Sequence, residues 1–126
     1  MIKFRAYLKD REKIVDVVEI DYRCNCIIWI NEKYTEIEDF KDIELLQSTG
    51  LKDKNGNEIY IGDILKVEDG YTQVVFHEYN TTYGIYLEDK EGGGNPISDY
   101  STRISLSHIK GIIEGNIYEH PHLLKE

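Results

Sequence analysis

The sequence has little of what several large protein classes need. Its 126 residues include only two cysteines, two prolines and one tryptophan, so no disulfide framework and no proline-rich segment is predicted. No apolar run approaches the roughly 20 residues that span a bilayer. The opening MIKFRAYLKD also lacks the apolar core of a signal peptide. We therefore expect one domain, residues 1–126, in a reducing cytoplasm.

Positive charge is also scarce, because 15 Lys and Arg stand against 24 Asp and Glu, a net charge of −9. Residues 1–23 hold six basic and five acidic side chains, or +1, so the remainder carries −10. Phosphate neutralisation supplies most of the affinity of nucleic-acid-binding domains, so this class is disfavoured. The alternative that stays open within this class is a small β-barrel protein that binds nucleic acid through the weakly basic N-terminal segment. That segment carries Arg5, Tyr7, Lys9, Arg11 and Lys13.

What is present is a series of short segments with the two-residue alternation of β-strands, such as IKFRAYL at residues 2–8. About seven such strands, separated by turns, predict a mainly β fold: a small, partly open β-barrel with at most one or two short helices. Thr35 and Glu38 have capping-box spacing and predict a short helix at about 36–42. A flexible loop is expected at about 90–96 and an irregular tail at 119–126. Exposed strand edges would permit homo-oligomerisation.

Three blocks of sequence resemble the YopX family of phage and prophage proteins. They are IKFRAY at the start, QSTGLKDKNGNEIYIGDI in the centre, and EGNIYEHPHLL near the end. The resemblance implies a small, mostly β, barrel-like protein encoded by temperate phages or prophages of low-GC Gram-positive bacteria. The cytoplasm in which we expect it is then that of the bacterial host cell. The family has no established activity, so the resemblance carries over no catalytic or ligand residue. We interpret its signature residues as structural turns that could also form an interaction surface: Gln47, Thr49, Gly50, Asp53, Asn55, Gly56, Tyr60, Gly62, Asp63, Gly115, Asn116 and Tyr118.

The central block invites two ligand interpretations, and its spacing fits neither. Its glycines are six apart and precede a strand-like ILKV, whereas a phosphate-binding loop opens a helix. Asp53, Asn55 and Asn57 occupy positions 1, 3 and 5 of a calcium loop, but position 12 is Ile64 rather than Glu. Asn55-Gly56 instead predicts a type I′ turn, and Gly62-Asp63 predicts a second reversal.

The sequence also gives little support for a metal site or a catalytic site. Cys24-Asn25-Cys26 would place two sulfurs on one face of a strand, but a closed zinc site needs four ligands. His120 and His122 could complete such a site only if the tail reached that strand. No serine lies in a nucleophile elbow, and Asp63 is the one candidate base for a residual enzyme alternative. We expect no cofactor, no metal and no catalytic residue.

Negative charge and ten tyrosines favour a non-enzymatic binding module acting on a host or phage protein. Aromatic side chains anchor interfaces, and Tyr71, Tyr79, Tyr83, Tyr86 and Tyr100 fall in the acidic second half. A nucleic-acid mimic is a specific form of this hypothesis, in which carboxylates occupy a basic cleft. The candidate surface is an acidic run that a solvated helix face would also explain: Glu36, Glu38, Asp39, Asp42 and Glu44.

Overall fold

The protein is described by a computed structural model that covers residues 3–68, 70–79, 82–91, 93–100 and 108–124. Within these ranges the chain forms twelve β-strands and three single turns of 3-10 helix, and no α-helix. The mainly β prediction is confirmed, although the sequence-based number of about seven strands was too low. No helix in the described ranges is long and apolar enough to cross a membrane.

Contacts between Cα atoms divide the chain into two compact units, named here unit 1, Met1–Gln47, and unit 2, Ser48–Glu126. Strand β6, Ile43–Lys52, passes through the boundary between them. Its first residues pair with β1 in unit 1, and Ser48 and Lys52 pair with β7 in unit 2. The single domain expected from chain length thus contains two compact units.

Unit 1 contains two antiparallel strand groups, one in the order β2-β1-β6 and one in the order β3-β4-β5. Alternate side chains of β1 and β4 point inward, which is the two-residue period of a half-buried strand. The buried core of the unit consists of Ala6, Leu8, Ile27, Trp29 and Ile43. The strands are β1 Phe4–Leu8, β2 Lys13–Asp16, β3 Glu19–Asp21, β4 Cys26–Asn31 and β5 Tyr34–Asp39.

The helix expected at about 36–42 is wrong. Residues 34–39 form β5, which pairs with β4 along its whole length, and only η1, Phe40–Asp42, makes a 3-10 turn. The residue before this turn, Asp39, makes no side-chain capping hydrogen bond. Pairing with a neighbouring apolar strand has outweighed the weak helical signal, because tertiary context commonly overrides local propensity.

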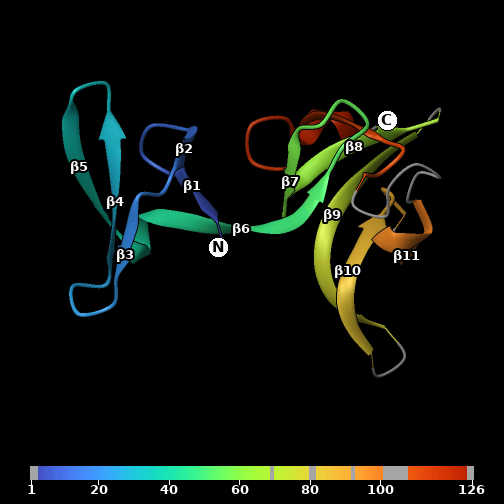
Figure 1. Ribbon diagram of the computed structural model, residues 1–126, viewed down its shortest axis with the longest axis horizontal. Helices are drawn as coiled ribbons and strands as arrows, with labels where there is room; N and C mark the ends of the chain where they lie inside the picture. The colour runs from blue at the N-terminus through green and yellow to red at the C-terminus, as the bar shows by residue number, and fades with distance from the viewer. Residues whose placement is uncertain (1–2, 69, 80–81, 92, 101–107, 125–126) are drawn as a thin grey trace. The chain divides into compact units, whose positions relative to one another are not determined.

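Unit 2 is built on a five-stranded antiparallel sheet in the order β11-β10-β9-β8-β12. Its long strands curl into an open half-barrel (Figure 1), so the partly open barrel is confirmed for this sheet. The buried core consists of Ile59, Leu65, Val74, Leu87, Ile97 and Ile109. The remaining strands are β7 Glu58–Tyr60, β8 Asp63–Val67, β9 Gly70–Tyr79, β10 Thr82–Glu88, β11 Gly94–Pro96 and β12 Ile112–Asn116.

Short regular elements occur within the segments that the sequence predicted to be a flexible loop and an irregular tail. Within the predicted flexible loop at 90–96, β11 pairs with β10. Within the predicted irregular tail at 119–126, η3, Pro121–Leu124, forms a 3-10 turn. Another 3-10 turn, η2, spans Ile97–Tyr100 and buries Ile97. Residues 92, 125 and 126 lie outside the described ranges.

Candidate functional site

The Asp53 carboxylate organises the first glycine turn of unit 2. It is fully buried, and its Oδ1 accepts hydrogen bonds from the amides of Asn55, at 2.9 Å, and Asn57, at 2.8 Å. Its Oδ2 accepts a third hydrogen bond, at 3.0 Å, from the amide of Ile113 in β12. Both carboxylate oxygens therefore accept hydrogen bonds from backbone amides, and the carboxylate joins the turn to a distant strand.

The turn itself is a three-residue loop rather than the predicted type I′ turn. The Asp53 amide donates to the Asn57 carbonyl at 2.8 Å, and the Gly56 amide donates to the Asp53 carbonyl at 3.0 Å. Of the three loop residues only Gly56, with φ of 86°, is left-handed. A type I′ turn needs positive φ at two residues, whereas three-residue hairpin loops commonly end in a left-handed glycine. A reversal is present, but its predicted type was wrong.

The second reversal, at Gly62-Asp63, is confirmed. Gly62 is left-handed, with φ of 99°, and its amide donates to the Val74 carbonyl at 2.9 Å. Its own carbonyl accepts from the Ile117 amide at 2.9 Å. The buried Asp63 carboxylate accepts from the Tyr60 amide at 2.8 Å. These bonds join the start of β8 to β9 and to the residue that follows β12, so this turn positions strands of the sheet.

The C-terminal signature residues also stabilise the local backbone through hydrogen bonds and close packing. Asn116 is buried, and its Oδ1 accepts from the amides of Tyr118, at 3.0 Å, and Glu119, at 2.8 Å. Its backbone amide donates to Nδ1 of His120 at 3.2 Å. Gly115 has no room for a side chain, because a Cβ there would lie 2.7 Å from the same Nδ1. The first tail histidine is thus packed against β12 of unit 2.

The remaining signature residues also support the backbone. The Thr49 hydroxyl donates to the Ile59 carbonyl at 2.7 Å and accepts from the Leu51 amide at 3.1 Å. Gly50 has a positive φ of 78°, and Tyr60 is buried. Gln47 is exposed and pairs in register with Phe4. The signature therefore builds the fold, apart from the exposed Gln47 side chain and the tips of the turns.

The acidic run of unit 1 does not form a helix face. Strand alternation divides it: Glu36 and Glu38 lie opposite Trp29 and Ile27, whereas Asp39 lies opposite Cys26 on the other face. Asp42 and Glu44 follow in η1 and β6. The run is therefore divided between the two faces of β5, the η1 turn and β6, and does not lie along one helix face.

Basic side chains engage part of the run. The Arg11 guanidinium lies 2.8 Å from Glu36, and this hydrogen bond lowers the pKa of the glutamate. Lys9 Nζ lies 3.7 Å from Glu44. Burial raises the pKa of Glu38, with nearby Asp10 adding to the effect. The free negative charge of this region is thus smaller than the sequence suggested.

Basic side chains of the N-terminal segment make contacts within unit 1. Arg5 pairs with Asp16 at 3.1 Å, and Lys13 Nζ lies 4.9 Å from the centroid of the Trp29 ring. Arg11 also lies over this ring, at 5.3 Å. A nucleic acid would have to displace carboxylates or the ring from these cations, so nothing in this geometry favours the nucleic-acid alternative.

The two cysteines do not share a strand face. Cys24 is exposed in the turn before β4, Asn25 has a positive φ of 54°, and Cys26 is buried at the start of the strand. The predicted arrangement is wrong because the turn extends to residue 25. Burial raises the pKa of the Cys26 thiol, and nearby Cys24 adds to this. Among the residues that the structure describes, no three His, Cys, Asp or Glu side chains are placed to hold a metal.

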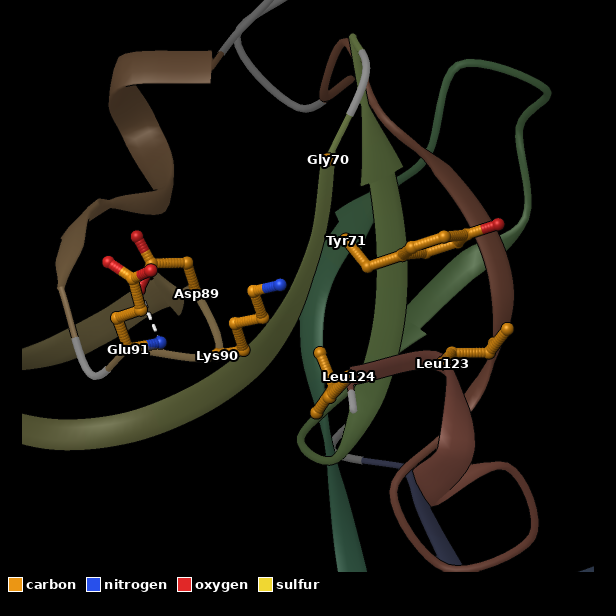
Figure 2. Close-up of a pocket in the computed structure, with 7 residues that line it drawn as sticks. All are labelled: Gly70, Tyr71, Asp89, Lys90, Glu91, Leu123 and Leu124. Carbon is orange, nitrogen blue, oxygen red and sulfur yellow. Dashed lines mark hydrogen bonds between the residues drawn. The ribbon is translucent and has the colours of Figure 1, made fainter. Parts of the chain in front are cut away.

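A hollow of about 540 Å³ lies in unit 2 (Figure 2). Leu123 and Leu124 of η3 contribute apolar surface on one side, and Asp89 and Glu91 contribute carboxylates on the other. Asp89 Oδ1 already accepts the amides of Glu91 and Gly93. None of the described residues that line the hollow is a histidine, serine or cysteine. The residues that line it are Gly70, Tyr71, Asp89, Lys90, Glu91, Leu123 and Leu124.

The most unusual surface is one that the sequence analysis did not identify: the outward face of the β3-β4-β5 sheet, here called the outer sheet face. Glu19, Ile28 and Ile37 form one row across the three strands, and Ile30 lies beyond it. Ile30 is 55% exposed and Ile37 is 64% exposed. Isoleucine rarely stays this exposed without covering, and two such side chains on neighbouring strands make an uncovered apolar patch.

Two strongly exposed tyrosines belong to this sheet and its turns. Tyr22 and Tyr34, in unit 1, are 72% and 74% exposed. Tyr22 packs edge-on against Phe40 with 5.9 Å between ring centroids. In unit 2, Tyr86 is buried, while Tyr71 and Tyr100 are half-buried. The side chains of Tyr79 and Tyr83 lie outside the described part of the chain.

These features define the protein as a small, two-unit, mainly β protein whose glycine and carboxylate turns are structural. The family described as YopX protein matches residues 3–125, so this chain belongs to the YopX family. No curated protein matches it. The crystal structure of protein EF1440 from Enterococcus faecalis is similar, with a TM-score of 0.60 and 26% sequence identity over 98% of both chains. The resemblance first seen in three sequence blocks therefore extends over nearly the whole chain.

Proposed function

We propose that this protein is a non-enzymatic binding module that attaches to a host or phage protein through the outer sheet face of unit 1. The main observation behind this proposal is the exposure of Ile30 and Ile37, which lie on adjacent strands of one sheet. Covering each side chain would contribute on the order of 1 to 2 kcal/mol. Exposed apolar patches of this kind mark interaction sites in soluble proteins.

The charge around the patch favours a basic partner. Strands β3, β4 and β5 contain no lysine or arginine. Glu19 and Asp39 lie on the outer sheet face in register with Ile28 and Cys26. Carboxylates at the edge of an apolar patch steer oppositely charged partners and discourage acidic ones. Tyr22 and Tyr34 add exposed aromatic surface of the type that anchors interfaces.

Affinity capture from a Gram-positive host lysate, with and without prophage induction, tests this proposal. Tagged wild-type protein is compared with Ile37→Ser and with the control Phe76→Ser. Phe76 is 62% exposed, nearly the same as Ile37, but lies on β9 of unit 2. We expect one captured protein to be lost with Ile37→Ser, retained with Phe76→Ser, and weakened by salt. Capture that is equal with all three proteins would contradict the proposal.

A further inference from the structure

Strand β5 leaves one of its two edges open. It pairs with β4 and ends the strand order β3-β4-β5, and no other described strand pairs with it. Figure 1 shows it as the outermost strand of its sheet. An open edge presents a row of unpaired backbone groups that can template a further strand. Native edges are commonly blunted by proline, by a bulge or by charged side chains. β5 has no proline, lysine or bulge, and its charged residues are Glu36, Glu38 and Asp39.

The register identifies which backbone groups face outward. The Phe40 amide donates to the Asn25 carbonyl at 2.8 Å, so residue 40 points toward β4. In an antiparallel strand the amide and carbonyl of one residue point to the same side, and successive residues alternate. Glu36 and Glu38 therefore also face β4, whereas Thr35, Ile37 and Asp39 face the open edge. The side chains of these same three residues lie on the outer sheet face.

We propose that the partner binds by strand addition: an extended segment with alternating apolar and basic residues pairs with the open edge of β5. This rests on the proposed function and specifies how the outer sheet face is used. Main-chain hydrogen bonds supply affinity in such complexes, and alternate side chains supply specificity. Apolar residues of the segment extend the row that Ile28 and Ile37 begin, and its basic residues lie beside Glu36 and Glu38.

Charge argues for a basic segment rather than a second copy of this chain. Two antiparallel β5 strands with Ile37 opposite Ile37 would place Glu36 of each copy opposite Glu38 of the other. Like charges directly opposite each other destabilise a strand pair. Burial already raises the pKa of Glu38, and an added cation would favour its charged form. Glu36 is already paired with Arg11 at 2.8 Å, so the preference for Lys or Arg on the added strand comes mainly from Glu38. The like-charge contacts between the two copies disfavour self-pairing.

A fluorescein-labelled peptide, Lys-Val-Lys-Val-Lys-Val-Lys, is the probe, and fluorescence anisotropy is the readout. One version carries N-methyl groups on every valine, another on every lysine that follows the first residue. In antiparallel addition the valine amides face β5, so we expect valine methylation to weaken binding at least about tenfold and lysine methylation to have little effect. The reverse pattern means parallel addition and also supports the proposal.

Three results overturn strand addition. The first is equal binding by both methylated peptides, or equal loss from both. The second is equal binding by the block peptide Lys-Lys-Lys-Lys-Val-Val-Val, which has the same charge without alternation. The third is no binding at about 1 mM of the unmethylated peptide. None of these readouts requires a change in the protein, so they do not depend on a variant that folds.

Two protein variants complete the test. Ile37→Pro removes an outward-facing amide that makes no bond to β4, whereas Ile37→Ala removes the side chain and keeps that amide. We expect Ile37→Pro to bind the peptide at least about threefold more weakly than Ile37→Ala, and equal binding counts against strand addition. If Ile37→Ser loses the captured partner but methylation of the peptide does not change its binding, strand addition is overturned and the proposed function stands. Capture unchanged by Ile37→Ser would overturn the proposed function itself.

Discussion

The buried carboxylate of Asp53 accepts a hydrogen bond from the backbone amide of Ile113, 60 residues further along the chain, at 3.0 Å. The same carboxylate closes its own turn through the amides of Asn55 and Asn57. A local turn and a long-range strand contact thus share one side chain. This sharing gives the turn-rich segment a structural role in unit 2.

Replacing Asp53 should strongly destabilise unit 2. Asp53→Ala leaves three amides without their acceptor, two of them in the turn and one in β12. We expect the free energy of unfolding to fall by about 2 to 4 kcal/mol in urea denaturation followed by circular dichroism.

The control for this experiment is Asp89→Ala. Asp89 accepts two loop amides in the same manner but is exposed to solvent. Water can replace it, so the expected loss is less than about 1 kcal/mol. Equal losses for the two variants would mean that the buried hydrogen bonds of Asp53 stabilise the fold no more than the exposed ones of Asp89.

Gly115 should not tolerate a methyl group. In Gly115→Ala the new Cβ would lie 2.7 Å from Nδ1 of His120, which accepts the Asn116 amide. We expect a loss of roughly 1 to 3 kcal/mol in the free energy of unfolding, typical of an overpacked site. Gly70→Ala is the control, because a Cβ at that position would have no atom within 4 Å and its φ is not left-handed. A Gly115→Ala protein as stable as Gly70→Ala would contradict this packing.

The Arg11–Glu36 pair predicts an acid-sensitive unit 1. Its hydrogen bond lowers the pKa of Glu36 in the folded state, so the native state binds fewer protons than the unfolded state just below pH 4.5. The stability that the pair provides is therefore present above that pH and is lost as pH falls through the lowered pKa. Fluorescence of Trp29, the only tryptophan, reports unfolding in urea because Arg11 lies over its ring.

Glu36→Gln isolates this effect. The variant cannot ionise at position 36, so its stability should fall less than that of the wild type between about pH 4.5 and pH 3. Glu38 works in the opposite direction, since burial raises its pKa and protonation stabilises the fold. Identical pH profiles for the wild type and Glu36→Gln would show that the ion pair does not contribute to stability.

The two cysteines should differ in reactivity. Cys24 is exposed, whereas Cys26 is buried and burial raises the pKa of its thiol. Alkylation with iodoacetamide at pH 8, followed by mass spectrometry, should modify Cys24 first and leave Cys26 until the protein is unfolded. Cys24→Ser should remove the fast modification altogether. Equal modification rates at the two positions would contradict the placement of Cys26 in the strand.

The sequence predicted the class of fold because short alternating strands and turn residues are local signals. It mistook β5 for a helix because Thr35 and Glu38 fit a capping box, and strand pairing with β4 cannot be read from a short segment. It also placed Cys24 and Cys26 on one strand, since nothing local shows that Asn25 adopts a positive φ.

The outer sheet face could not be predicted for a different reason. The run Ile27-Ile28-Trp29-Ile30 is continuously apolar, which is typical of a strand buried on both faces. In the structure Ile27 and Trp29 are buried in the core, and Ile30 is exposed on the other face. Whether a second layer covers that face depends on the tertiary arrangement and not on the strand itself.

Hydrogen–deuterium exchange of the purified protein with its captured partner tests the central proposal most directly. Binding through the outer sheet face and the β5 edge predicts slower exchange in peptides that cover residues 26–39. It also predicts no change at the structural turns, residues 53–63. Protection at these turns, or around the hollow that Tyr71 and Leu124 line, with residues 26–39 unchanged, would contradict the proposal.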